Sequence, residues 1–188
     1  MIHDRPVGVV LTGGASARMG VDKATLVVDG KPMAVHVGDA LWEASCHPGE
    51  CQGGDIEAIR GYGLDVVPDR RPGDGPLHAI HDALQRHVSE SVVVAACDLV
   101  DLDAETIRSV IDAGSADTDA DVAVAGSDGD RHLVAWWRAG AVDRIGSLLH
   151  GGVDSFRGAL AELRTIDVEV PSDRVRNLNT PSDVDARG

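Results

Sequence analysis

Residues 11–26 combine glycines with polar and cationic side chains at a spacing that suits phosphate chemistry. The stretch reads LTGGASARMGVDKATL, and it contains one of only two lysines in a chain whose other cations are arginines. A glycine turn lets backbone N–H groups approach a phosphate that larger side chains would keep away. A lysine ammonium is a compact point charge that suits contact with phosphate oxygens. Gly13, Gly14 and Lys23 therefore indicate a bound phosphate, and the plainer alternative is a tight turn without a ligand.

The spacing of this loop excludes two familiar phosphate-binding motifs. The Walker pattern requires G-x-x-x-x-G-K-[ST], but Gly14 and Gly20 stand one residue too far apart and Val21 follows the second glycine. The dinucleotide fingerprint requires G-x-G-x-x-G, and counting from either glycine of the pair places Ala15 or Ser16 at the second glycine. What remains is the string G-G-x-S-x-R-M-G-x-D-K, which belongs to neither class.

Asp98 is the second candidate, because it follows the apolar run SVVVAAC at residues 91–97. A carboxylate at the carboxyl end of a central strand can hold Mg²⁺, which binds one or two protein carboxylates together with substrate phosphates. The alternative role is the N-cap of the following helix, but Asp103 is better placed for that. The sequence therefore predicts a metal ligand at Asp98.

The elements that must position these residues alternate between strands and helices. Apolar runs typical of strands buried on both faces lie at 6–11 and 91–100. Further strands are predicted at 50–52, 63–69, 120–126 and 131–137, and a short extended segment with an Asp-Gly turn at 24–32. Helices are predicted at 32–44, 75–88, 103–114, 140–150 and 155–163, with Gly114 as the stop of the third.

This alternation is typical of an α/β fold with a mainly parallel sheet and helices on both faces, in which ligands bind beyond the carboxyl ends of the strands. The length predicts a single domain over residues 1–188. A net charge of −14 argues against a nucleic-acid partner, although a local pocket can still oppose the global field. No run approaches the ~20 apolar residues of a membrane helix, and the first residues do not read as a signal peptide. We therefore expect no membrane partner and a cytoplasmic protein.

The string at residues 13–23 resembles the nucleotidyltransferases, and most closely the molybdenum cofactor guanylyltransferases. Later segments follow in the expected order, namely PDRRPGDGPLHAI, AACDLV, RHLVAWW and NLNTPSDV, so the resemblance spans nearly the whole chain. It implies a Rossmann-like three-layer sandwich of the nucleotide-diphospho-sugar transferase type. It also implies transfer of GMP from GTP to the phosphate of molybdenum-molybdopterin, with release of pyrophosphate and with Mg²⁺ as cofactor. The implied partners are GTP and molybdopterin, and transient contact with molybdoenzymes or other cofactor-assembly proteins is compatible with it.

The resemblance also assigns roles to individual residues. Catalysis is expected from Arg18, Lys23 and Asp98, with Asp98 as the metal ligand, and the acceptor is expected at Asn177 and Asn179. The nucleotide is expected to contact Leu11, Thr12, Gly13, Gly14, Ser16, Lys23, Gly54, Asp69, Gly75 and Asp98.

Several of these residues also have a purely structural interpretation. Arg18 can be a solvated loop charge, Asp69 can be a turn residue beside Pro68, and Gly75 can simply precede a proline-initiated helix.

One departure from the family pattern concerns the nucleobase. The guanylyltransferases carry an asparagine after the second strand that helps to hold the nucleotide, and its counterpart here is Gly54, in the segment CQGGD. Gln52 or a backbone group can take the place of that asparagine. A cytidylyltransferase, or a nucleotidyltransferase with another phosphorylated acceptor, is therefore the main alternative. A nucleotide-binding protein without catalysis is the alternative from another class.

Overall fold

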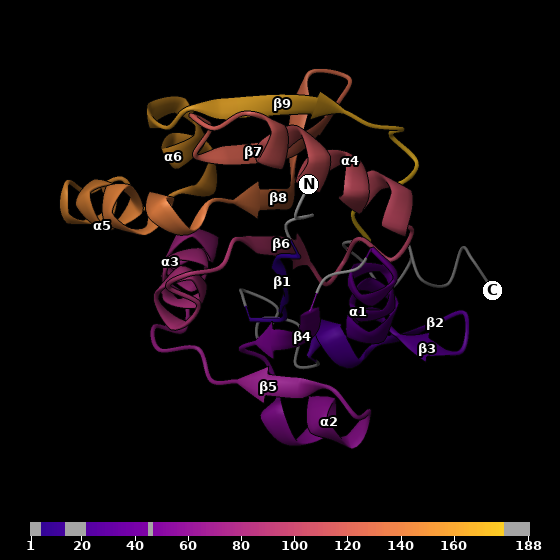
Figure 1. The fold of residues 1–188 in the computed structure, drawn as a ribbon. Coiled ribbons are helices and arrows are strands. Elements are labelled where there is room, and N and C mark those ends of the chain that lie inside the picture. Colours follow the sequence, from indigo (N-terminus) through magenta and orange to yellow (C-terminus); the bar gives the residue numbers. More distant parts are fainter. Residues whose placement is uncertain (1–4, 14–21, 45–46, 179–188) are drawn as a thin grey trace.

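A seven-stranded sheet forms the centre of the protein (Figure 1). The computed structural model describes residues 5–13, 22–44 and 47–178. The strands are β1 (Val7–Leu11), β4 (His47–Gln52), β5 (Asp65–Val67), β6 (Val92–Ala96), β7 (Val122–Ser127), β8 (Asp130–Trp137) and β9 (Thr165–Glu169). Their order is β5-β4-β1-β6-β8-β7-β9, and only β8 runs antiparallel to its neighbours within this sheet. The expectation of a mainly parallel sheet is confirmed.

Helices cover both faces of the sheet and give three layers (Figure 1). They are α1 (Met33–Glu43), α2 (Ile56–Gly61), α3 (Pro76–Arg86), α4 (Ala104–Ala116), α5 (Val142–His150) and α6 (Phe156–Glu162). Two short 3-10 turns, η2 (Lys23–Thr25) and η3 (Ala139–Ala141), and a hairpin of β2 (Val27–Val28) and β3 (Lys31–Pro32) complete the elements of the described residues.

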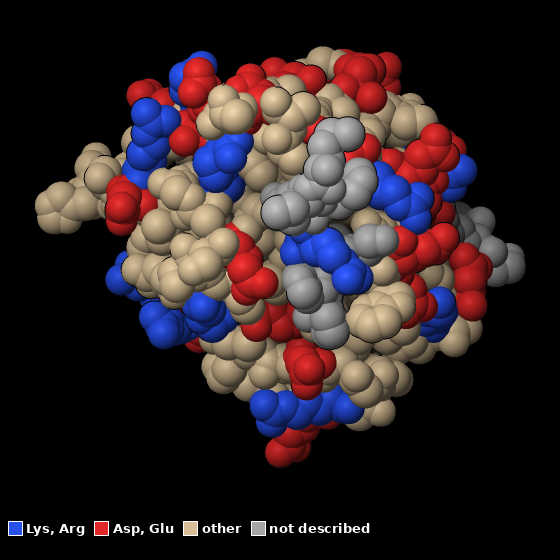
Figure 2. Space-filling view, viewed as in Figure 1, with Lys and Arg blue, Asp and Glu red and all other residues tan. Residues whose placement is uncertain are grey.

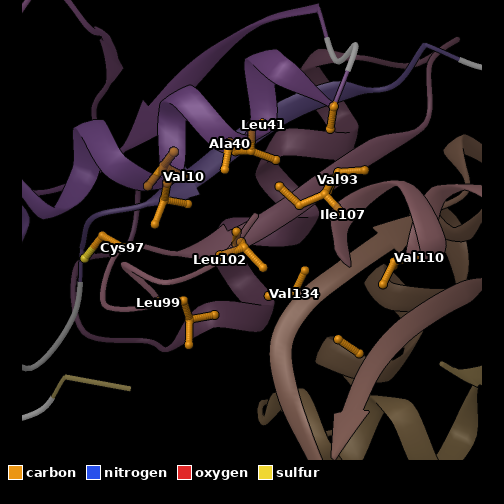
Figure 3. Close-up of a cluster of buried hydrophobic side chains, with 14 of the residues drawn as sticks. Val10, Ala40, Leu41, Val93, Cys97, Leu99, Leu102, Ile107, Val110 and Val134 are labelled. Atoms are coloured by element: carbon orange, nitrogen blue, oxygen red, sulfur yellow. The ribbon is translucent and has the colours of Figure 1, made fainter. Parts of the chain in front are cut away.

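Each face of the sheet has its own apolar core. One core joins α1, α2 and α4 to the sheet, and the other joins α3, α5 and α6 to the opposite face. In Figure 3, Val10 and Val93 of the sheet belong to the same cluster of buried side chains as Leu41 of α1 and Ile107 of α4. Strands β1 and β6 supply side chains to both cores, which explains why their sequences are apolar without interruption.

Besides the two 3-10 turns, one helix and one strand were not predicted from the sequence, namely α2 and β9. Helix α2 has six residues, too few for a helical period to emerge, and it begins because the Asp55 side chain accepts a hydrogen bond from the Ala58 N–H at 3.1 Å. Strand β9 lies at the edge of the sheet and keeps charged residues exposed, so it lacks the apolar run of a central strand. Strand β4 also begins three residues before the predicted 50–52.

The predicted helix stop at Gly114 is wrong. Helix α4 continues to Ala116, and Gly114 is buried inside it. A Cβ atom at Gly114 would lie 2.2 Å from Cε3 of Trp136, whose side chain is 1% exposed. The indole of Trp136 packs directly against the helix backbone at Gly114 and leaves no room for a side chain. No sequence pattern predicts this contact.

The carboxyl ends of four neighbouring parallel strands meet in register. Leu11 at the end of β1 is paired with Gln52 of β4 on one side and with Ala96 of β6 on the other, and Gln52 is paired with Val67 of β5. The segments that follow these strands therefore emerge at one edge of the sheet, where ligands bind in this fold class. Within the described parts of the chain, each helix is too short or too polar to traverse a bilayer.

Candidate active site

The segment after β1 is tied to the ends of β4 and β5. The backbone N–H groups of Thr12 and Gly13 each donate to the carbonyl of Gln52 at 3.0 Å. The Thr12 hydroxyl donates to the carbonyls of Gln52 at 3.0 Å and Gly53 at 2.7 Å, and it is buried. The N–H groups of Thr12 and Gly13 therefore already have partners within the protein.

Gly13 is in close contact with Gly53 and Asp69. Gly53 has a φ of +82°, and a Cβ atom there would lie 2.8 Å from Cα of Gly13. A Cβ atom at Gly13 would lie 3.3 Å from Oδ2 of Asp69. The other carboxylate oxygen of Asp69 accepts a hydrogen bond from the Arg71 N–H at 3.0 Å. Asp69 is therefore a turn residue, which is the structural alternative given above for it. It also lies beside Gly13.

The direction in which a side chain at Gly54 would point is already filled. Gly54 has a φ of +78°, and a Cβ atom there would lie 2.9 Å from Oδ2 of Asp22 and 2.9 Å from Cδ1 of Ile59. Asp22 is held in place because its Oδ1 accepts from the Ala24 N–H at 2.9 Å and its Oδ2 accepts from the Asp55 N–H. Asp22 occupies the space that an asparagine side chain at position 54 would need, and this role was not predicted from the sequence.

The side chain of Gln52 does not replace that asparagine at the loop. It is 1% exposed, and its Oε1 accepts a hydrogen bond from the guanidinium of Arg86 on α3 at 3.0 Å. The same guanidinium donates to the carboxylate of Glu50. Gln52 thus belongs to a polar cluster between β4 and α3, and of the two substitutes that we considered only a backbone group remains available at the loop.

Asp98 receives one partner on each of its carboxylate oxygens. The Lys23 ammonium donates to Oδ2 at 2.8 Å, and the Asn177 side-chain amide donates to Oδ1 at 3.2 Å. The Lys23 and Asp98 side chains are only 13% and 15% exposed. Residues that lie far apart in the sequence are thus brought together at the carboxyl end of β6, and we call them the Lys23–Asp98–Asn177 group.

The segment on both sides of Asn177 is bonded to the loop that follows β6. The Leu178 N–H donates to the Asp98 carbonyl at 3.0 Å, and Arg174 pairs with Asp103 at 3.2 Å. Asp103 also accepts a hydrogen bond from the backbone N–H of Thr106 in the first turn of α4, so the predicted N-cap is confirmed. The Asp98 side chain therefore does not cap this helix. Burial would raise the pKa of Asp103, but the hydrogen bonds at the helix start and the nearby Arg174 outweigh it and lower that pKa.

Gly75 lies at the N-terminus of α3, with a φ of +92° and Pro76 at the next position. Among the described residues, the carbonyl of Asp154, at 3.8 Å, is the neighbour that a Cβ atom there would meet. Gly75 therefore lies beside the connection between α5 and α6, and its expected contact with the nucleotide stays a prediction. Gly14, Ser16, Arg18 and Asn179 lie outside the described residues.

The two cysteines of the described part are structural. Cys51 and Cys97 are free and buried, and burial raises the pKa of each thiol to about 12. Both thiols stay protonated at neutral pH, so neither is a nucleophile or a thiolate ligand.

Basic and acidic side chains are interspersed on the face of the molecule shown in Figure 2. On the face shown in Figure 2, Lys and Arg side chains occur in separate small groups among Asp and Glu side chains. They do not form a continuous basic stripe on that face, which is the usual footprint of a nucleic-acid interface.

Comparison with known proteins places this architecture in a family. The model of the MobA-like NTP transferase domain matches residues 8–165. A molybdenum cofactor guanylyltransferase from Rhizobium meliloti (strain 1021) is 30% identical over 95% of this chain and 88% of that protein. The chain is also similar to the solved structure of molybdopterin-guanine dinucleotide biosynthesis protein A from Archaeoglobus fulgidus, with a TM-score of 0.71, 21% identity, and coverage of 96% and 95%.

A further similar structure is that of Rv0371C from Mycobacterium tuberculosis H37Rv in complex with manganese, with a TM-score of 0.73, 19% identity and coverage of 96% of both chains. These two structures agree with the observed fold, and the family model and the sequence relative agree with the resemblance found in the loop string. The chain belongs to the MobA-like NTP transferase family.

Proposed function

We propose that this chain is a molybdenum cofactor guanylyltransferase, which transfers GMP from GTP to the phosphate of molybdenum-molybdopterin. Its family and the name of its relative from Rhizobium meliloti support this proposal. The observation that carries it is the Lys23–Asp98–Asn177 group at the carboxyl end of β6. That group combines an ammonium with a carboxylate at the edge where this fold class binds nucleotides.

The reaction needs no covalent intermediate on the protein. An oxygen of the acceptor phosphate attacks the α-phosphorus of GTP and forms the new P–O–P bond. The bond from the α-phosphorus to the bridging oxygen of the β-phosphate breaks, and pyrophosphate leaves with the electron pair. Negative charge accumulates around the α-phosphorus, so the protein must supply cations there. Lys23 is suited to this role, and Arg18 is the second cation that we expect.

Asp98 fits the role of ligand to a divalent metal. The ligand at this point is the carboxylate of Asp98, whose hard oxygen atoms suit Mg²⁺ or Mn²⁺. Within the described residues, no group of three or more His, Cys, Asp or Glu side chains forms a complete metal cage. Mg²⁺ does not need one, because it takes one or two protein carboxylates and completes its shell with phosphates and water. The metal would neutralise phosphate charge in this site.

Asn177 and Asn179 remain our candidates for the acceptor. The nucleotide-binding set also remains our proposal, except that the backbone N–H groups of Thr12 and Gly13 donate to Gln52 and are not offered to a phosphate. Asn177 is exposed and adjoins Asp98, so an acceptor phosphate in contact with Asn177 would lie near the carboxylate that we assign to the metal. Transient contact with molybdoenzymes or other assembly proteins would let the finished cofactor pass on. We expect these steps in the cytoplasm.

The crowding around Gly54 favours a second candidate within the same reaction type. No asparagine side chain can occupy this position without displacing Asp22 or Ile59. The base must therefore be selected by other groups, and cytosine is the main alternative to guanine.

Titration calorimetry with GTP, CTP and ATP in the presence of Mg²⁺ tests the proposal. We expect binding of GTP that is at least ~10-fold tighter than that of the other two nucleotides, which corresponds to about 1.4 kcal/mol. A preference for CTP would move the protein to cytidylyl transfer. Folded protein that binds no nucleotide would refute the enzymatic function.

A further inference from the structure

We propose that the Lys23–Asp98 ion pair is the closed state of the site and that it must open when substrate enters. In this exchange the ammonium leaves the carboxylate for a nucleotide phosphate, and a divalent metal takes its place on Asp98. The ion pair thereby couples the binding of metal to the binding of nucleotide. This inference rests on the proposed function, because that function identifies the two ligands.

The geometry shows that both groups are engaged with each other. The Lys23 Nζ atom lies 2.8 Å from Oδ2 of Asp98, and both side chains are more than four-fifths buried. The remaining oxygen, Oδ1, already accepts from Asn177 at 3.2 Å. A metal ion cannot gain full access to this carboxylate while the ammonium stays on it, and a phosphate cannot gain full use of the ammonium.

The charges explain why the two ligands should enter together. The closed pair is neutral, and a divalent metal added alone would meet an ammonium within hydrogen-bond distance of its own ligand atom. A nucleoside triphosphate brings several negative charges, which give the ammonium a new partner and the metal further ligands. A metal alone would hold its charge beside the ammonium, and a nucleotide alone would draw the ammonium away and leave the carboxylate with the neutral amide of Asn177.

The local backbone allows the exchange without refolding. Lys23 is the first residue of η2, and the turn is fixed by the Asp22 side chain on the Ala24 N–H and by the Leu26 N–H on the Lys23 carbonyl at 3.2 Å. The ammonium stands at the end of a flexible four-carbon stem. Rotation of this stem is enough to move the charge from Asp98 to a phosphate.

The chain offers a matched control, because it has only one other lysine. Lys31 pairs with Asp39 at 2.6 Å, but these side chains are 43% and 61% exposed and lie on the surface. Lys23→Met and Lys31→Met therefore remove the same charge from a mostly buried pair and from an exposed one.

The first test measures Mn²⁺ affinity without nucleotide, by the paramagnetic resonance signal of free Mn²⁺. We expect Lys23→Met to tighten Mn²⁺ binding by ~5-fold, as expected for release of one ion-pair partner, and Lys31→Met to leave it unchanged. The same Lys23→Met variant should bind GTP at least ~10-fold more weakly, because it lacks the phosphate contact. The same substitution is thus expected to raise the affinity for Mn²⁺ and to lower the affinity for GTP. A general loss of structure would lower both affinities.

Asp98→Asn separates failure of this inference from failure of the proposed function. If Asp98→Asn weakens Mn²⁺ binding while Lys23→Met and Lys31→Met behave alike, Asp98 is a metal ligand but the exchange is wrong. If Asp98→Asn binds Mn²⁺ as the unaltered chain does, the metal assignment and the exchange are both wrong.

A second test uses the unaltered chain and therefore does not depend on the folding of a variant. With ε-¹⁵N-lysine, the protein has two side-chain ammonium resonances, and the Lys31→Met spectrum assigns them. We expect saturating Mg²⁺ and GTP together to shift the Lys23 resonance and to leave that of Lys31 in place. A Lys23 resonance that stays unchanged at saturation would overturn the exchange.

Discussion

Substitution of Gly54 tests how this site differs from the family pattern. Gly54 has a φ of +78°, and Gly63 has a similar φ of +81° with no atom within 4 Å of a Cβ built there. Gly63→Ala therefore measures the cost of the left-handed backbone alone, about 1–2 kcal/mol. Gly54→Ala carries the same cost and in addition must displace the side chains of Asp22 and Ile59, each 2.9 Å from the new Cβ atom.

The extra cost at Gly54 can be bounded from what holds these neighbours. Asp22 accepts two backbone hydrogen bonds, and Ile59 is 1% exposed, so neither can move freely. Overpacking of this kind costs about 1–3 kcal/mol, so Gly54→Ala should destabilise the protein by about 2–5 kcal/mol in total. Gly54→Asn should lose less stability to the left-handed backbone than Gly54→Ala, because asparagine tolerates this conformation. It should still lose the stability that is needed to displace Asp22 and Ile59.

Urea unfolding followed by fluorescence of the buried Trp136 and Trp137 gives these free energies, and calorimetry gives the GTP affinity of each folded variant. We expect the free energy of unfolding to be lower for Gly54→Ala than for Gly63→Ala by about 1–3 kcal/mol. We also expect Gly54→Asn to bind GTP no more tightly than the unaltered chain. Equal free energies for the two alanine variants, or tighter GTP binding by a stable Gly54→Asn protein, would refute this reasoning.

Three further predictions follow from other parts of the molecule. Asp98→Asn should lower the rate of pyrophosphate release at least ~100-fold while the circular dichroism stays unchanged, because the amide lacks the charge that holds the metal; near-normal turnover would disprove the assignment. Gly114→Ala should lower the free energy of unfolding in urea by about 3 kcal/mol, since its Cβ would lie 2.2 Å from the ring of Trp136, and a cost below about 0.5 kcal/mol would contradict this packing. Burial lowers the pKa of His81 below its ordinary 6.5, so the unfolded chain takes up protons first and stability should fall as the pH drops below 6.5. His81→Gln should reduce that slope in thermal unfolding, and an unchanged slope would show that other groups cause it.

The sequence was sufficient where one strand or helix alone carries the signal. Strands β1 and β6 are buried on both faces, so their continuous apolar runs predict them as strands. The prediction of Asp103 as the N-cap of α4 is also confirmed. Helix α2 and strand β9 were missed because a six-residue helix and a half-exposed edge strand carry little periodicity.

In the candidate site, the individual residues were predicted but the contacts between them were not. Lys23 and Asp98 are predicted as site residues from the sequence around each of them, and Asn177 is predicted from the family resemblance. Their mutual contacts are not, because the pairing of residues 75 and 79 positions apart depends on where η2 and the C-terminal segment meet the end of β6. The packing of Gly114 on Trp136 and the placement of Asp22 beside Gly54 were missed for the same reason.

The most direct test of the central claim is a turnover assay with molybdenum-molybdopterin as acceptor. The purified chain is incubated with Mg²⁺ and either GTP or CTP, pyrophosphate is quantified, and the dinucleotide product is identified by mass spectrometry. We predict that pyrophosphate is released from GTP only when the acceptor is present, in equal amount to a guanine dinucleotide product. Formation of the cytosine dinucleotide instead, or no release of pyrophosphate from either nucleotide by folded protein, would contradict the account.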